Sequence, residues 1–127
     1  MPTVLIVDDE PNVVDVVRVT LEDDRIRVVA AADGAAALAV AVAERPDLVL
    51  LDINLPDYTG LEVCRRLRAD PRLAGVRIVM LAAAQRTDVA RGLAAGADRY
   101  LTKPVSPVGL LSLVDELLPG TALWARD

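Results

Sequence analysis

The sequence predicts one α/β domain built on a five-stranded parallel sheet with helices on both faces. Two apolar runs, at residues 4–7 and 48–51, each lead directly into aspartate. Such a run is typical of a strand buried on both faces of a parallel sheet. Strand-like and helix-like segments alternate five times, which favours a doubly wound sheet. We expect the domain to span residues 1–118, with 119–127 as a tail or the start of a linker.

The first half of the chain predicts three strands and two helices. Pro11 suits the first turn of a helix, since its missing N–H is not needed there. The apolar residues that follow it recur on one helical face. The expected elements are a strand at 4–7, a helix from Pro11 through Val13, Val14, Val17 and Leu21, a strand at Arg27–Ala31, a turn at Asp33–Gly34, an alanine-rich helix at 35–44 and a strand at 48–51.

The second half continues the alternation after a loop at residues 54–60. Proline and glycine mark where its helices end: Asp70–Pro71 follows the third helix, and Gly96 is a natural C-cap for the fourth. The expected elements are helices at 61–68, 88–95 and 108–118, a strand at 76–81 and a short strand at Tyr100–Leu101.

The composition excludes several classes of function. The chain contains no histidine, so it can form neither a Ser-His-Asp triad nor a histidine-ligated zinc site. Its formal net charge of −5 argues against nucleic-acid binding by the domain itself. One cysteine, no basic leader and no apolar run near the ~20 residues that span a bilayer predict a cytoplasmic protein without membrane contact.

Charged residues follow three of the expected strands. Asp8 and Asp9 follow the first, Asp52 the third and Lys103 the fifth. Because ligands of doubly wound sheets bind beyond the carboxyl ends of the strands, these side chains should converge. Close carboxylates repel one another, and Mg²⁺ with its oxygen ligands relieves that repulsion. Lys103 is the only lysine beside thirteen arginines, which indicates a specific use of a compact ammonium group.

With these residues in place, the chain resembles the receiver domain of two-component response regulators. The resemblance covers residues 3–118 and implies the flavodoxin-like (βα)5 fold with strand order 2-1-3-4-5. The segments that carry it are VLIVDDEP (4–11), ADGAAAL (32–38), DLVLLDINLPDYTGLEV (47–63) and GADRYLTKP (96–104).

The resemblance implies a phosphorylation-controlled switch that takes its phosphoryl group from a histidine kinase or a histidine phosphotransfer protein. Such a domain is not an enzyme beyond its own phosphotransfer and autodephosphorylation. It passes the signal to an effector through helix four, strand five and helix five. The implied residues are Asp52 as phosphoacceptor, Asp8, Asp9, Asp52 and the backbone carbonyl of Asn54 as Mg²⁺ ligands, Lys103 as phosphoryl partner, a cis Lys103–Pro104 bond and Tyr100 as the switch aromatic.

One position departs from the family pattern. Receivers usually carry threonine or serine at the end of strand four, where this chain has Ala82. The nearest downstream hydroxyl, on Thr87, is five residues away. We therefore expect weaker coupling between phosphorylation and Tyr100, and a Tyr100 ring that is inward or mixed in the resting state.

Two alternatives from other classes stay open. Ala82 is compatible with a pseudo-receiver, an interaction module that keeps the fold without switching by phosphorylation. An aspartate-nucleophile phosphatase of the haloacid dehalogenase type would also use Mg²⁺ and lysine. It needs a second aspartate where this chain has Asn54, and a cap domain.

The output surface departs from a second family pattern. Regulators with winged-helix effectors commonly have an acidic residue at the position of Arg99 and an arginine in helix five. Residues 108–118 contain no basic residue. The sequence therefore predicts that the symmetric dimer through helix four, strand five and helix five does not form.

Overall fold

A computed structural model describes residues 2–82 and 86–118, without the side chains of residues 86–88. Five parallel strands form one sheet in the order β2-β1-β3-β4-β5, which confirms the predicted topology. The strands are β1 (Thr3–Val7), β2 (Arg27–Ala31), β3 (Leu48–Asp52), β4 (Arg77–Ala82) and β5 (Arg99–Thr102). The helices are α1 (Pro11–Leu21), α2 (Gly34–Glu44), α3 (Gly60–Ala69), α4 (Arg86–Ala94) and α5 (Pro107–Leu117).

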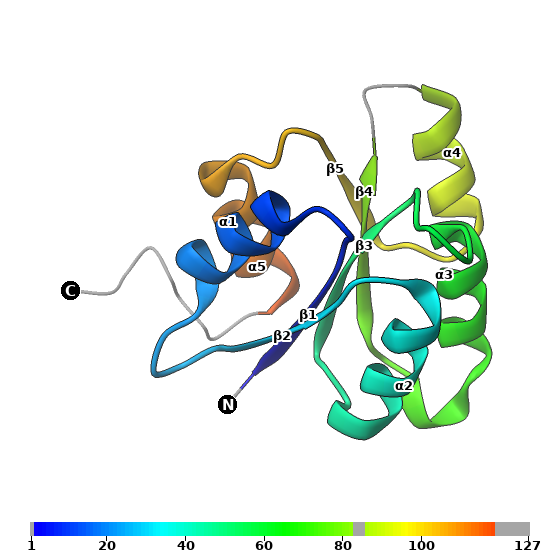
Figure 1. The fold of residues 1–127 in the computed structure, drawn as a ribbon, viewed down its shortest axis with the longest axis horizontal. Coiled ribbons are helices and arrows are strands. Elements are labelled where there is room, and N and C mark those ends of the chain that lie inside the picture. Colours follow the sequence, from blue (N-terminus) through cyan, green and yellow to red (C-terminus); the bar gives the residue numbers. More distant parts are fainter. Residues whose placement is uncertain (1, 83–85, 119–127) are drawn as a thin grey trace.

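The helices form two layers around the sheet. In Figure 1, α1 and α5 lie on one side of the sheet and α2, α3 and α4 on the other. Two apolar cores result. One packs the sheet against α2 and α3 and includes Ala37, Ala41, Cys64 and Leu67. The other packs it against α1 and α5 and includes Val17, Leu21, Leu110, Val114 and Leu117.

The burial of the strands explains the sequence pattern. Every residue of β1 and β3 is buried, because helices cover both faces of these central strands. The edge strands β2 and β5 contain exposed residues instead. For this reason the sequences of the edge strands lack the continuous apolar run seen in β1 and β3.

Among the described residues, three of the α-helices begin at a residue whose side chain accepts a backbone N–H, as N-caps do. Asp33 caps α2 through the N–H of Ala36 (2.7 Å), Thr59 caps α3 through that of Glu62 (3.2 Å), and Ser106 caps α5 through that of Gly109 (3.3 Å). The predicted turn at Asp33–Gly34 is thus the start of a helix.

Other differences from the predicted elements are small. Most ends differ by one or two residues, where end effects outweigh periodicity. A short 3₁₀ helix at Pro71–Leu73 was not predicted. Gly96 follows α4 with φ of +115°, in agreement with its predicted role. The predicted tail at 119–127 lies outside the described residues, and no described helix is long and apolar enough to cross a bilayer.

Candidate functional site

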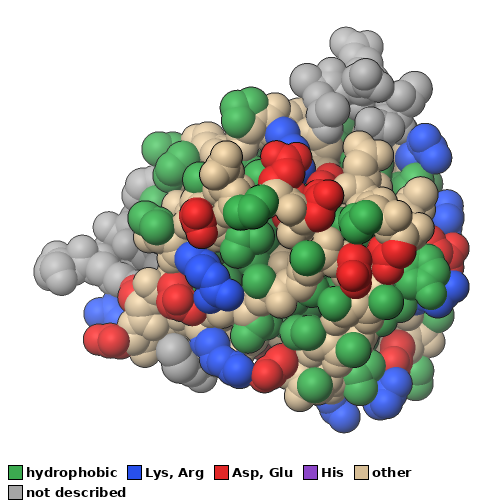
Figure 2. All heavy atoms as spheres, in the orientation of Figure 1, with side chains coloured by type: hydrophobic (Ala, Val, Ile, Leu, Met, Phe, Trp, Pro, Cys, Tyr) green, Lys and Arg blue, Asp and Glu red, His purple; other side chains and the backbone are tan. Residues whose placement is uncertain are grey.

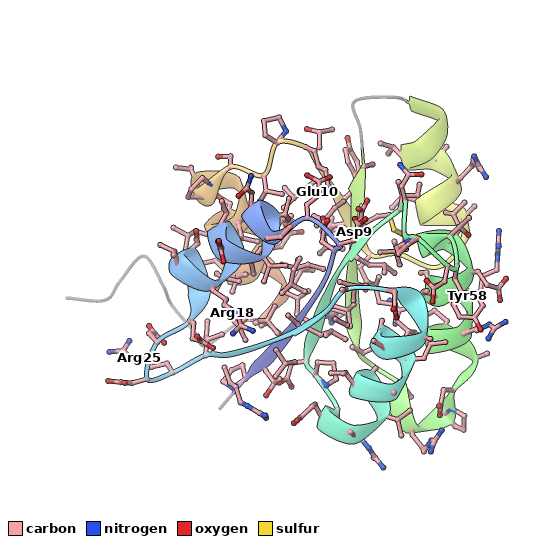
Figure 3. The ribbon with its side chains drawn as sticks, in the orientation of Figure 1. Asp9, Glu10, Arg18, Arg25 and Tyr58 are labelled. Carbon is pink, nitrogen blue, oxygen red and sulfur yellow. The ribbon has the colours of Figure 1, made fainter. Side chains whose placement is uncertain are left out.

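The carboxyl ends of β1 and β3 and the chain after β5 meet at one edge of the sheet. The Nζ atom of Lys103 lies 2.9 Å from Asp8 Oδ2 and 3.1 Å from Asp52 Oδ2. Figure 3 labels Asp9 where β1 runs into α1, at this same edge. The structure therefore brings together the three aspartates and the lysine that the sequence singled out.

Asp8 and Asp52 are buried, with side chains 0% and 6% exposed. Oδ1 of Asp8 accepts the N–H of Glu10 (2.9 Å), and Oδ1 of Asp52 accepts that of Asn54 (3.1 Å). Lys103 donates to Asp52 Oδ2. Within the described part of the chain, Asp8 Oδ2 accepts no hydrogen bond, although it lies within ion-pair distance of Lys103. A buried carboxylate oxygen in this position is suited to a cation.

Two opposed effects act on the charges of the site. Burial raises the pKa of Asp52, and the negative charge of Asp8 adds to this, while the N–H of Asn54 and the ammonium of Lys103 oppose it. Burial alone would lower the pKa of Lys103, but the carboxylates of Asp8 and Asp52 outweigh it and raise that pKa. Lys103 is therefore a fixed positive charge that faces the two buried carboxylates of Asp8 and Asp52.

The acidic side chains are close enough to share one metal ion. Carboxylate oxygens of Asp8, Asp9, Glu10 and Asp52 all lie within 4.8 Å of one another. Figure 2 shows acidic side chains on the surface over this part of the molecule, where Figure 3 labels Asp9 and Glu10. Oxygen donors of this number and charge, together with the unsatisfied Asp8 Oδ2, fit a hard divalent cation such as Mg²⁺.

Glu10 belongs to the site, although the sequence did not mark it as functional. Its Oε1 lies 3.3 Å from Lys103 Nζ, and its side chain is 61% exposed. The signal was its position directly after Asp8 and Asp9. Acidic residues are also common at the start of a helix, where they interact favourably with the helix dipole, so this position alone did not indicate a functional role.

The loop between β3 and α3 approaches the site closely. Asn54 is exposed and pairs with Thr59 in an isolated antiparallel bridge. Gly60 begins α3 against the backbone of Asp52: a Cβ there would lie 2.2 Å from the Asp52 carbonyl oxygen. Only glycine permits this approach. On the other side of the site, the Lys103–Pro104 peptide bond is cis, the form implied by the resemblance.

The switch positions differ in part from expectation. Ala82 ends β4 and is fully buried, and its carbonyl accepts the N–H of Lys103 (2.9 Å). Tyr100 is 45% exposed, so its ring is not buried inward in this structure. That the ring occupies mixed positions in the resting state stays a prediction. The side chain of Thr87 lies outside the described residues.

Comparisons with known proteins agree with this fold. The family model for the response regulator receiver domain matches residues 4–115. Among solved structures, a putative response regulator from Chloroflexus aurantiacus has a TM-score of 0.87 at 34% identity, covering 92% of this chain and 98% of that one. The chemotaxis response regulator CheY4 of Vibrio cholerae has a TM-score of 0.86 at 35% identity, covering 93% and 99%. The chain therefore belongs to the receiver domain family of response regulators, which are two-component signalling proteins.

Curated relatives are longer proteins. The chain is 43% identical to the "DNA-binding dual master transcriptional regulator RpaA" of Synechocystis sp. over 95% of its length and 51% of that protein. It is 44% identical to the "DNA-binding response regulator MtrA" of Mycolicibacterium smegmatis over 87% of its length and 48% of that protein. The chain thus spans about half the length of these relatives. Their names describe the whole proteins, so the absence of nucleic-acid binding by residues 1–118 stays a prediction.

Proposed function

We propose that this chain is a switch that accepts a phosphoryl group on Asp52 from a phosphohistidine of a partner kinase or phosphotransfer protein. The observation that carries the proposal is a nearly buried carboxylate at the end of β3, 3.1 Å from the ammonium of Lys103. The acidic cluster beside it supplies the oxygen ligands for Mg²⁺.

The proposed transfer uses the chain's own groups in defined roles. A carboxylate oxygen of Asp52 bonds to phosphorus as the phosphorus–nitrogen bond of the donor breaks. The imidazole leaves and takes up a proton, and an acyl phosphate remains on Asp52. Lys103 neutralises negative charge on the phosphoryl oxygens. Mg²⁺, held by Asp8, Asp9, Asp52 and the Asn54 carbonyl, would supply further charge neutralisation there.

An apolar groove beside the site suits the phosphodonor protein. Its volume is about 430 Å³. Because a donor imidazole must approach Asp52 within bonding distance, the donor protein has to cover the surface next to Lys103. We therefore assign this groove to the kinase or phosphotransfer protein. It is lined by Glu10, Asn12, Val13, Val16, Lys103, Pro104 and Val105.

Acetyl phosphate tests the proposed function without a partner protein. The chain is incubated with acetyl phosphate and Mg²⁺, and its mass is measured intact. We expect a mass increase of one phosphoryl group that EDTA prevents and that alkaline hydroxylamine, which cleaves acyl phosphates, removes. A chain that binds Mg²⁺ but gains no phosphoryl group would instead favour the pseudo-receiver, which the missing hydroxyl at Ala82 keeps open.

Ala82→Thr is expected to strengthen the coupling between Asp52 and Tyr100. A hydroxyl at this buried position can donate to a charged phosphoryl oxygen, a bond worth about 1.5–3 kcal/mol. The switching equilibrium should therefore shift by about one to two decades. The measurement is the change in NMR chemical shifts of α4, β5 and Tyr100 on adding beryllofluoride. Ala82→Val is the control, because it adds similar bulk without the hydroxyl. Equal responses in all three proteins would show that the hydroxyl is dispensable.

The chain is expected to remain monomeric after phosphorylation, with no dimer forming through the surface of α4, β5 and α5. Arg99 Nε donates to Glu116 of α5 in the same chain (2.9 Å), so the two charges satisfy each other internally. Sedimentation with and without beryllofluoride checks this. A beryllofluoride-dependent dimer that forms through α4 and α5 would contradict the prediction.

A further inference from the structure

Asp57, at the tip of the loop between β3 and α3, binds the first turn of a different helix. Its Oδ1 accepts the N–H of Gly34 (2.7 Å), and its Oδ2 accepts that of Ala35 (2.9 Å). These N–H groups are among those that a helix leaves without internal partners at its start. The hydrogen bond from Gly34 contributes most to holding the pKa of Asp57 below its usual range. The carboxylate thus ties the loop to α2.

This contact is more than a helix cap, because α2 already has one. Asp33 accepts the N–H of Ala36 from the adjoining segment. The ring of Tyr58 adds a second contact between loop and helix, since a Cβ at Gly34 would lie 2.6 Å from Tyr58 Cδ2. The guanidinium of Arg66 lies 4.5 Å from the centre of that ring, within the range of a cation–π contact. Figure 3 labels Tyr58 on the side of the molecule where α2 and α3 lie.

The other end of the same loop lies at Asp52. The bridge between Asn54 and Thr59 closes the loop, and Asn54 donates its N–H to Asp52 Oδ1 (3.1 Å). Gly60 packs against the Asp52 backbone immediately beyond the loop. The bridge holds the loop at its base and Asp57 holds its tip to α2. Asn54 therefore has little freedom to move relative to Asp52.

We propose that Asp57 is a positioning residue: by tying the loop to α2, it holds Asn54 beside Asp52 and so sets the affinity of the site for Mg²⁺. This inference rests on the proposed function, in which the Asn54 carbonyl is a metal ligand. Loss of an outer partner of a metal ligand typically lowers metal affinity about 10- to 100-fold. Asp57 acts through several backbone bonds, so we expect Asp57→Ala to lower Mg²⁺ affinity by about 3- to 10-fold.

Asp33→Ala is the matched control. It removes the other carboxylate from the start of α2 but leaves the tether of the loop intact. Mg²⁺ is titrated into the unphosphorylated chain and followed by calorimetry. We expect the affinity of Asp33→Ala to stay within about twofold of the unaltered chain, and Asp57→Asn, which keeps one acceptor oxygen, to lie between the extremes. If Asp57→Ala binds Mg²⁺ as tightly as Asp33→Ala, the inference is overturned.

Amide hydrogen exchange provides a readout that needs no metal. Asp57→Ala should speed exchange at residues 53–59, whereas Asp33→Ala should speed it only in the first turn of α2. Equal exchange of the loop in both variants would also overturn the inference. Failure of the proposed function looks different: the unaltered chain would gain no phosphoryl group from acetyl phosphate. An unaltered chain that binds no Mg²⁺ would overturn the metal-affinity role of Asp57.

Discussion

Asp52→Asn is expected to reduce phosphorylation by acetyl phosphate to background. The asparagine amide can still accept the N–H of Asn54, but it offers no carboxylate to form an acyl phosphate. The variant should remain folded. Burial raises the pKa of Asp52, which means that the ionised carboxylate is less favourable in the folded chain. Replacing it with a neutral amide therefore should not lower stability near neutral pH.

Intact mass after incubation with acetyl phosphate and Mg²⁺ measures this effect, and circular dichroism checks the fold. Asp24→Asn is the control, because Asp24 is exposed in the loop between α1 and β2. Equal phosphorylation of Asp52→Asn and the unaltered chain would disprove the assignment of the phosphoacceptor.

Lys103→Met should still accept a phosphoryl group on Asp52, but the rate of phosphorylation should fall by roughly 10²-fold, as removal of a charge-stabilising donor does elsewhere.

Arg68→Met is expected to cause a large loss of stability. Arg68 donates to the carbonyls of Gly96 (2.8 Å) and Val76 (2.5 Å) and to the carboxylate of Asp98 (2.6 Å). The side chains of Arg68 and Asp98 are only 28% and 24% exposed. Removing the guanidinium leaves these acceptors poorly solvated, which should lower the free energy of unfolding by about 2–4 kcal/mol.

Urea denaturation followed by circular dichroism measures the loss. Arg99→Met is the control, because the two side chains of its ion pair with Glu116 are 52% and 48% exposed. Exposed pairs of this kind contribute little to stability, so the control should change the midpoint far less. Comparable midpoints for the two variants would mean that the Arg68 contacts do not hold α3 to the β4 and β5 side of the sheet.

The sequence by itself determined the fold class and which aspartates and lysine meet at the site, although not that Glu10 joins them. Residues 4–7 and 48–51 are apolar at every position, a run typical of a strand covered on both faces. Once the strands are parallel, their carboxyl ends share one edge. The positions of Asp8, Asp52 and Lys103 along the chain were therefore enough to predict that they meet.

The tertiary structure decided which side chains contact one another across long stretches of chain. Glu10 and Lys103 are 93 residues apart, Arg68 and Asp98 are 30, and Gly34 and Asp57 are 23. Hydropathy and spacing describe neighbours within one element, whereas these contacts depend on how the elements pack. The exposure of Tyr100 has the same origin. Its position on β5 follows from the sequence, but the packing around the ring depends on a rotamer, which is set only when β5 and its neighbours are in place.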